Sequence, residues 1–329
     1  MLDPDLRYLI HIARFRSMAR AADELAVSQS TLSRAVQRLE SRFGVGLVDR
    51  TSHGVCLTDP GKRLVARLAD ADRQLRDAEN ELNDIAQGRK GVVRIAAGHT
   101  VSSPVVRALV PRLRIDRPAA NLQLDTCFNK RLMMRLIDGD YDFGVSLIPA
   151  ELPPELVAYP LLRDRLVPVV RQGHPITSIA NPKVDDLMQF LWAGADSHIL
   201  SNAALDALFL RAKVGRPDYA VQCSSYEAAI DAVKSSDCIA FAPDWQVHQG
   251  LGLGAGLTIV EVPGFAHPRT LGILERRGAY ISPLGRRAQE LVTEALELLN
   301  ARAAKLSAHT SGPTPRSAPR PPPAWASGS

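Results

Sequence analysis

The chain has 329 residues, of which 46% are hydrophobic and 23% are charged, with a formal net charge of +5. This length suits two or three domains, and the lack of an apolar run of about 18 or more residues excludes an ordinary membrane span. The first residues, MLDPDLRYLIHIARFRS, lack the features of a secretory signal, so we expect a cytoplasmic protein without a membrane partner. Charges of both signs are nearly balanced along the chain, and bulk charge therefore does not predict nucleic-acid binding.

The sequence carries no motif of the common catalytic, cofactor or metal sites. Its four cysteines, Cys56, Cys127, Cys223 and Cys238, form no CxxC pair, which argues against a disulfide framework and a zinc site. GxSxG, Walker, GxGxxG and HExxH patterns are absent. The glycine-rich stretch 250–256 follows APDW and is expected to form a turn. We therefore expect no enzyme activity, no cofactor and no metal.

Three short helices and a hairpin are predicted in residues 1–58. The first helix spans 4–15 with Asp3 as its cap, and the second runs from Met18 to about Leu25 after Ser17. Ser28 caps a third helix that ends at Gly44. The stretch LVDRTSHGVCLT then predicts two short strands around a His53–Gly54 turn, which completes a winged helix-turn-helix.

The third helix has an outward face suited to a DNA groove. With Leu32, Val36 and Leu39 facing inward, the opposite face carries Ser30, Ser33, Arg34, Gln37 and Ser41, with Gln29 beside them. Arginine pairs with guanine, glutamine pairs with adenine, and serine bonds to bases or phosphates. The alternative is a solvated face, but such faces usually use Glu and Lys pairs, which are absent here. In the hairpin, Arg50 and His53 are expected to reach phosphates or a minor groove.

A narrow apolar seam runs along the helix predicted from Pro60 to Gln87. Leu64, Leu68, Leu75 and Leu82, with Ala71, Ala78 and Ile85, are spaced alternately four and three residues apart. This heptad spacing predicts self-association through a coiled coil. Packing on the chain's own body is the alternative. We expect residues 59–90 to form a dimerising linker that ends in a hinge at QGRKG.

Strands and helices alternate from residue 91 to residue 302. The order β-α-β-α-β, followed by a second set and a late return strand, predicts a parallel sheet in each of two lobes around a cleft. We call residues about 91–161 and 268–302 lobe I, and residues about 162–267 lobe II. The Pro/Ser/Ala-rich tail, 303–329, is expected to be disordered.

Hydroxyl and amide side chains follow several of these strands and mark a candidate ligand cleft. In lobe I they are Thr100, Ser102, Ser103, Asn129 and Ser146; in lobe II they are Ser197, His198, Asn202 and Ser225. Strand ends that meet helix N-termini are where open α/β sheets bind ligands, and the helix dipole favours anions. We therefore expect a small organic acid as the ligand, although plain helix capping is the competing role, above all for Ser103.

The segment AADELAVSQSTLSRAVQRLESRFGVGLVDRTSHGVCLTDPG resembles the N-terminal signature of the LysR-type transcriptional regulators. The match is dense over residues 5–65, and the linker helix and the bilobed domain follow in the family's order. Ser30 stands where the family often has Pro, and Val48 where it often has Phe, which leaves the operator sequence open.

The resemblance implies an α/β architecture: an N-terminal winged helix-turn-helix, a long linker helix and a bilobed effector domain like the periplasmic binding proteins. It implies a bacterial, sequence-specific regulator of transcription that binds double-stranded promoter DNA and a small-molecule effector. It also implies a dimer or a tetramer, and RNA polymerase as a further partner. The helix-turn-helix span is Met18 to Gln37. The DNA-binding residues it implies, with the two hairpin residues, are Gln29, Ser30, Thr31, Ser33, Arg34, Gln37, Arg38, Arg50 and His53.

Two other functions are weighed against this one. A solute-binding protein fits the two lobes, but it does not explain the first 90 residues or the missing signal. An architectural DNA binder would leave the α/β region without a role. The sequence does not indicate whether the regulator activates or represses, which genes it targets, or what the tail does.

Overall fold

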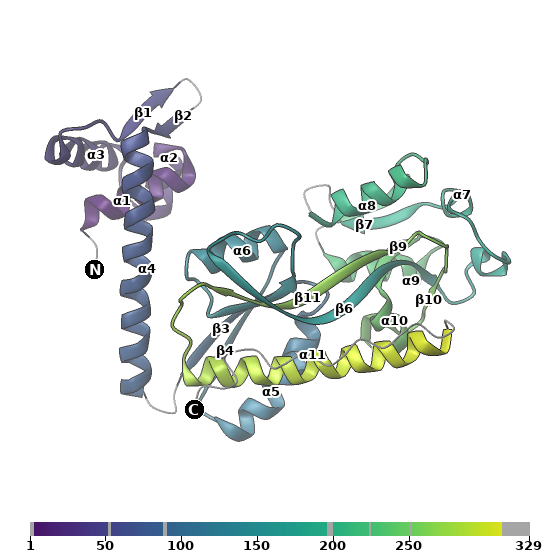
Figure 1. Cartoon of the computed structure of the whole chain (residues 1–329). Coiled ribbons are helices and arrows are strands. Elements are labelled where there is room, and N and C mark those ends of the chain that lie inside the picture. The colour runs from purple at the N-terminus through teal and green to yellow at the C-terminus, as the bar shows by residue number, and fades with distance from the viewer. Residues whose placement is uncertain are drawn as a thin grey trace. The chain divides into compact units, whose positions relative to one another are not determined.

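The computed structural model describes residues 3–51, 54–87, 91–195, 200–223, 225–249 and 252–310. Two compact units, Met1–Gln87 and Gly88–Ser329, are described here one at a time (Figure 1). Three residues expected at binding sites, His53, Ser197 and His198, lie outside the described residues.

Three helices open the first unit and confirm the predicted caps. They are α1 (Pro4–Phe15), α2 (Met18–Leu25) and α3 (Gln29–Phe43). The side chains of Asp3, Ser17 and Ser28 each accept a hydrogen bond from a backbone amide of the first turn. Such bonds satisfy amides that the helix itself cannot pair. Gly44 ends α3 in the left-handed region, with φ +70°, which glycine adopts without steric cost.

The helices pack on a hairpin of β1 (Val48–Thr51) and β2 (Gly54–Leu57), which pair antiparallel as predicted. The three helices, the strand β2 and the residue just before β1 supply the buried core: Leu9, Ile12, Ala21, Ala22, Leu32, Ala35, Val36, Leu39, Leu47 and Val55. The Glu40 carboxylate accepts hydrogen bonds from the backbone amides of Leu47 at 2.7 Å and Val48 at 3.2 Å. This carboxylate therefore ties the end of α3 to the hairpin.

The linker helix α4 (Asp59–Gln87) grows directly out of this core. Thr58 caps its start, where its hydroxyl accepts from the Gly61 amide and donates to the Gly46 carbonyl. A Cβ atom at Gly61 would lie 2.1 Å from the Leu47 carbonyl oxygen, closer than any real contact. Glycine is therefore required at position 61 for α4 to approach the segment before β1.

A seven-stranded mixed sheet forms the framework of the second unit. Its parallel part consists of β3 (Val92–Ala97), β4 (Asn121–Thr126) and β5 (Phe143–Leu147), as the sequence predicts. Two long antiparallel strands, β6 (Leu156–Arg171) and β11 (His267–Arg276), continue the sheet. Both strands span the expected boundaries between the lobes. Two separate parallel sheets, one in each lobe, were expected from the sequence.

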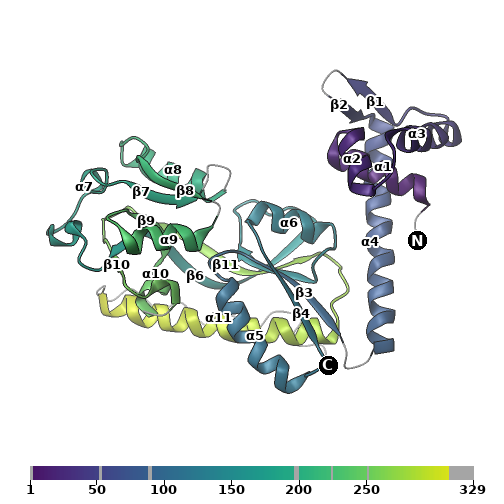
Figure 2. The ribbon, with the colours of Figure 1, turned by 180° about the vertical axis from the view of Figure 1, so that it is seen from behind.

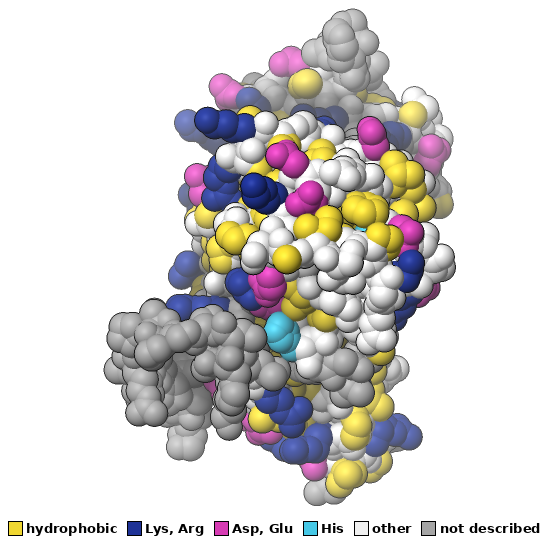
Figure 3. Space-filling view, turned by 90° about the vertical axis from the view of Figure 1, so that its right-hand side faces the viewer, with side chains coloured by type: hydrophobic (Ala, Val, Ile, Leu, Met, Phe, Trp, Pro, Cys, Tyr) yellow, Lys and Arg dark blue, Asp and Glu magenta, His cyan; other side chains and the backbone are white. Residues whose placement is uncertain are grey.

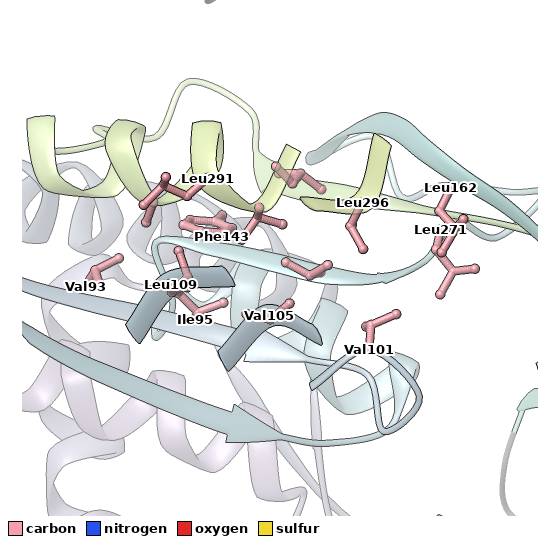
Figure 4. Packing of buried hydrophobic residues seen from close by; sticks show 14 of the residues in the cluster. Val93, Ile95, Val101, Val105, Leu109, Phe143, Leu162, Leu271, Leu291 and Leu296 are labelled. Atoms are coloured by element: carbon pink, nitrogen blue, oxygen red, sulfur yellow. The ribbon is translucent and has the colours of Figure 1, made fainter. Parts of the chain in front are cut away.

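Helices cover both faces of the lobe I sheet. They are α5 (Ser102–Asp116), α6 (Asn129–Ile137) and α11 (Pro283–Thr310). The two ribbon views agree that α6 lies on one face and that α5 and α11 lie on the other (Figures 1 and 2). Between α5, α11 and the strands is the main core, where Val105 and Leu109 of α5 and Leu291 of α11 pack around Phe143 (Figure 4).

Lobe II is built around the C-terminal part of β6, which pairs with β9 and β10. Its elements are the 3-10 helix η1 (Pro175–Ser178), α7 (Val184–Leu187), β7 (Trp192–Ala195), α8 (Leu200–Arg211), β8 (Tyr219–Cys223), α9 (Tyr226–Ser235), β9 (Ala240–Pro243), α10 (Asp244–Gln249), η2 (Gly252–Gly254) and β10 (Leu257–Ile259). Two hydrophobic clusters lie here, one near Ile230 of α9 and one around Trp192. The 3-10 turn at 252–254 occupies the glycine-rich stretch, where a turn was expected.

The last helix runs further than predicted. The tail was expected to be disordered from residue 303, but α11 continues to Thr310. Residues 302–306, RAAKL, are good helix formers, and the first strong helix breakers are Gly312 and Pro313.

In Figure 3, positive and negative side chains are interspersed over the face drawn, and neither sign forms a continuous patch. In the described part of the chain, no helix is long and apolar enough to cross a membrane.

Candidate DNA-binding and effector sites

The outward face of α3 is exposed as the helical periodicity predicts. Gln29, Ser30, Arg34 and Gln37 are exposed and Ser33 is half-buried, whereas the leucines of the other face are buried. The Arg34 Nε donates to the Ser30 carbonyl at 3.4 Å, one turn earlier, and its guanidinium forms no ion pair in the described part. An amide, hydroxyls and a fork-shaped cation therefore line one accessible helix face, as a helix in a major groove requires.

Hydroxyl groups gather at the N-terminus of α3. The Ser28 hydroxyl lies 2.8 Å from the hydroxyls of both Ser30 and Thr31, and it accepts from the Thr31 amide. Thr31 was expected to contact DNA, but its hydroxyl is engaged in this cap. The Ser30 hydroxyl lies on the exposed side of the same cluster.

Arg38 is held by an ion pair that the sequence does not reveal. Its Nε and Nη2 bond to the two carboxylate oxygens of Asp5 at 2.7 and 2.6 Å. The hydrogen bond from Arg38 lowers the pKa of the Asp5 carboxyl, so the pair is charged at neutral pH. The pair fixes α1 against α3, and because the Arg38 side chain remains 57% exposed, its expected contact with DNA stays a prediction. The pair joins residues 33 positions apart, beyond the reach of local pattern analysis.

The hairpin and linker residues have mixed placements. Arg50 belongs to β1, and its side chain lies outside the description. Along the α4 seam, Leu68 is only 8% exposed and Leu64 packs beside the core of the first unit, whereas Leu82 is 66% exposed. The N-terminal part of the seam therefore packs against the core of the same chain. The whole seam had been expected to pack against a partner chain. Leu75 is half-buried.

In lobe I, the strands β3 and β4 both lead into helices that have no side-chain cap. Helix α5 starts at Ser102 after Val101, and α6 starts at Asn129 after Phe128. Ser103 was expected to cap α5, but its hydroxyl bonds to the Arg107 guanidinium, and the Ser102 hydroxyl donates to the His99 carbonyl. At α6 the missing cap leaves backbone N–H groups available to an anion. At α5 the amides of Val101 and Ser102 donate to the Gly98 carbonyl, and Pro104 has no N–H.

Asn129 is the most informative of the expected ligand residues. Its side-chain nitrogen and oxygen are both buried, and neither has a hydrogen-bond partner in the described part of the chain. A buried polar group without a partner is costly and is usually paired with water or a ligand. The ring of Phe128, the preceding residue, contacts the His99 ring in a tilted arrangement, with a centroid distance of 4.4 Å and an interplanar angle of 39°. Burial lowers the pKa of His99, so this ring is neutral at pH 7.

The remaining expected ligand residues are distributed unevenly. Ser146 is only 4% exposed, and its hydroxyl would lie 2.7 Å from a Cβ at Gly98, so it packs under the loop after β3. Ser225 was expected among the ligand residues, but it caps α9, where it accepts from the Ala228 amide at 3.2 Å and bonds to Glu227. Asn202 lies in α8, and its side chain is not described.

The two crossing strands carry a buried ion pair that sequence reasoning missed. Asp164 of β6 accepts from Arg269 Nε of β11 at 2.9 Å and from a second nitrogen of the same guanidinium. Trp245 Nε1 also donates to Asp164 at 3.1 Å. A groove of about 910 Å³ opens beside this pair, lined in part by Arg163, Pro268 and Leu147. None of the expected ligand residues lines it.

The chain combines a helix-turn-helix bearing an exposed polar face with a separate α/β unit in which α6 has no side-chain cap and begins at the unpartnered Asn129. That combination defines a DNA-binding regulator. A family model described as "Bacterial regulatory helix-turn-helix protein, lysR family" matches residues 4–62, and one described as "LysR substrate binding domain" matches residues 86–297. The chain belongs to the LysR family of transcriptional regulators, which are not enzymes.

Curated relatives match along most of their length. The SDS degradation transcriptional activation protein of Pseudomonas sp. (strain ATCC 19151) is 29% identical over 88% of this chain and 94% of its own. The hydrogen peroxide-inducible genes activator of Haemophilus influenzae is 25% identical over 88% of this chain and 94% of its own.

Solved structures share the fold at low identity. HinK, a LysR family regulator from Pseudomonas aeruginosa, is 20% identical with a TM-score of 0.51, over 90% of this chain and 98% of its own. Full-length CbnR in complex with its target DNA is 19% identical with a TM-score of 0.52, over 90% of this chain and 100% of its own.

Proposed function

We propose that α3 reads base edges of a promoter, that α4 pairs two copies of the chain, and that an organic anion bound in the cleft between the two lobes adjusts the promoter complex. The observation that carries the DNA contact is the sharp division of α3 into a buried apolar face and an exposed polar face. The complex of CbnR with its target DNA supports the same use of this unit. Cytoplasm is the location that promoter binding requires.

Arg34→Ala is expected to weaken binding to the specific promoter site by roughly 1–3 kcal/mol, since one good arginine–guanine pair discriminates by that amount. Binding to random duplex is expected to stay nearly unchanged. Fluorescence anisotropy with DNA taken from upstream of the protein's own gene, and with a shuffled duplex, measures both affinities. Arg63→Ala, an exposed arginine on α4, is the matched control. Equal losses on both duplexes would show that Arg34 is a phosphate clamp.

The effector is assigned as an anion because the uncapped N-terminus of α6 and the unpartnered Asn129 amide occur together. An amide nitrogen donates well to a carboxylate or sulfate oxygen. One relative is named for SDS degradation, and SDS is an alkyl sulfate, which also fits an anion. We also propose that two dimers associate on DNA, and that the complex acts through RNA polymerase.

Calorimetric titration of the full chain with acetate, benzoate, succinate and octyl sulfate tests the effector class. We expect at least one anion to bind and benzamide, the neutral analogue of benzoate, to fail. Asn129→Ala is expected to weaken the binding roughly tenfold or more, as loss of a hydrogen bond to a charged group does. Binding of benzamide alone would overturn the assignment of an anion.

A further inference from the structure

The short helix α10 joins the two lobes through three consecutive residues. Asp244 accepts from Arg165 Nε of β6 at 3.0 Å. Trp245 is 3% exposed and packs in the lobe I core, although it belongs to lobe II in sequence. Gln246 reaches the loop between β3 and α5. The three side chains thus contact the crossing strand, the lobe I core and the cleft loop.

Gln246 has both ends of its amide engaged. Its Nε2 donates to the Thr100 carbonyl of lobe I at 2.9 Å, and its Oε1 accepts from the Tyr226 hydroxyl of α9 at 2.7 Å. Gln246 is only 8% exposed. Burial raises the pKa of Tyr226, so its hydroxyl stays protonated and donates at neutral pH. A hydrogen-bonded chain of Tyr226, Gln246 and Thr100 therefore spans from lobe II to lobe I.

The glycine-rich turn accounts for the fixed position of Gln246. A Cβ at Gly254 would lie 1.9 Å from the Gln246 carbonyl oxygen and 2.9 Å from the Val247 amide nitrogen. Only glycine permits this approach of backbone to backbone. The glycine-rich stretch 250–256, which matches no catalytic motif, thus contains Gly254, whose backbone packs directly against the backbone of α10.

The loop held by Gln246 is also the loop that presents the candidate effector groups. The amides of Val101 and Ser102 both donate to the Gly98 carbonyl, which forms the turn leading into α5. The ring of His99, in the same loop, contacts the ring of Phe128, the residue that precedes α6. A shift at Thr100 is thereby transmitted to the starts of both uncapped helices.

We propose that Gln246 is a positioning residue of the effector site: it acts through the Thr100 carbonyl to fix the loop 98–101 against lobe II. This assignment rests on the proposed function, because it makes Gln246 set the geometry of the anion site. Effector entry and lobe movement are coupled through this contact, since a change at either end alters the other.

Hydrogen exchange on the full chain tests the contact without any ligand. Gln246→Leu is expected to speed exchange of the Val101 and Ser102 amides roughly five- to tenfold, as loss of one hydrogen bond implies. Gln246→Glu keeps the acceptor for Tyr226 and loses the donor to Thr100, so it is expected to give the same change in this loop. Gln123→Leu, an exposed glutamine of β4, is the control and is expected to have no effect.

Benzoate binding and thermal unfolding separate positioning from bulk stability. We expect Gln246→Glu to weaken benzoate binding severalfold while the unfolding temperature stays close to that of the wild type. Unchanged exchange in the 98–103 peptide of both variants would overturn the proposal. So would weakened binding accompanied by an equal rise of exchange across all of lobe I. If the wild type binds no anion, the effector class fails, and the exchange result still decides the contact.

Discussion

Asp164→Ala is expected to lower the free energy of unfolding of the second unit by about 3–5 kcal/mol, the usual effect of removing one partner of a buried ion pair. The Asp164 side chain is 0% exposed, and that of Arg269 is 8% exposed. The substitution leaves the Arg269 guanidinium and the Trp245 indole N–H without their acceptor. Urea unfolding followed by tryptophan fluorescence measures the change, since the three tryptophans all belong to this unit.

Asp206→Ala provides the matched control, because Asp206 pairs with Arg216 at a similar distance but on the surface, with side chains 39% and 72% exposed. Surface pairs contribute about 0–1 kcal/mol, and a loss in that range is expected. The double variant Asp164→Leu/Arg269→Met is expected to recover much of the stability, since apolar residues of similar volume remove the uncompensated charge. Equal losses for the buried and the surface carboxylate would contradict the role given to the crossing-strand pair.

Leu75→Asp is expected to convert the protein to monomers and to weaken promoter binding on the order of 100-fold. Pairing two recognition helices makes the second contact intramolecular, which strengthens binding by about 10²–10⁴. A charge in the apolar seam removes that pairing. Light scattering gives the mass of the variant, and anisotropy with promoter DNA gives its affinity.

Two further variants make the test of the seam specific. Leu82→Asp, at a side chain 66% exposed in the chain, cannot disturb the chain's own packing and is expected to act in the same direction. Gln74→Asp, exposed on the same helix, is expected to leave mass and affinity unchanged. An unaltered mass for both leucine variants would remove α4 from the assembly.

Local chemistry made much of the first unit predictable. The caps Asp3, Ser17 and Ser28 and the stop at Gly44 each depend on residues within one turn, so the helix limits were readable. The exposed face of α3 followed from helical periodicity alone. The role of Arg38 could not be found in this way, because Asp5 is distant in sequence and the two meet only when α1 packs on α3.

The candidate ligand site was predictable at the level of strand ends and less so at single side chains. A hydroxyl next to a helix start can bind a ligand or bond to a neighbouring group of the chain. The Ser103 hydroxyl bonds to the Arg107 guanidinium, and the Ser225 hydroxyl accepts from the Ala228 amide. Asn129 was identified because it follows a strand, although its buried, unpartnered amide is visible only in three dimensions. Gln246 was missed because its contact with Thr100 joins residues 146 positions apart.

The path of β6 and β11 has a consequence for how such regulators diversify. Leu166 and His267 face each other across this antiparallel ribbon, so the intervening hundred or so residues enter and leave at one point. Recombination between homologous genes at two points, the codons near residues 166 and 267, would exchange this block, because the two junctions are neighbours in the sheet although about 100 codons separate them in the gene. Such an exchange replaces the lobe II contact with the effector loop, made by Gln246, and leaves Asn129 of lobe I and the helix α3 unchanged.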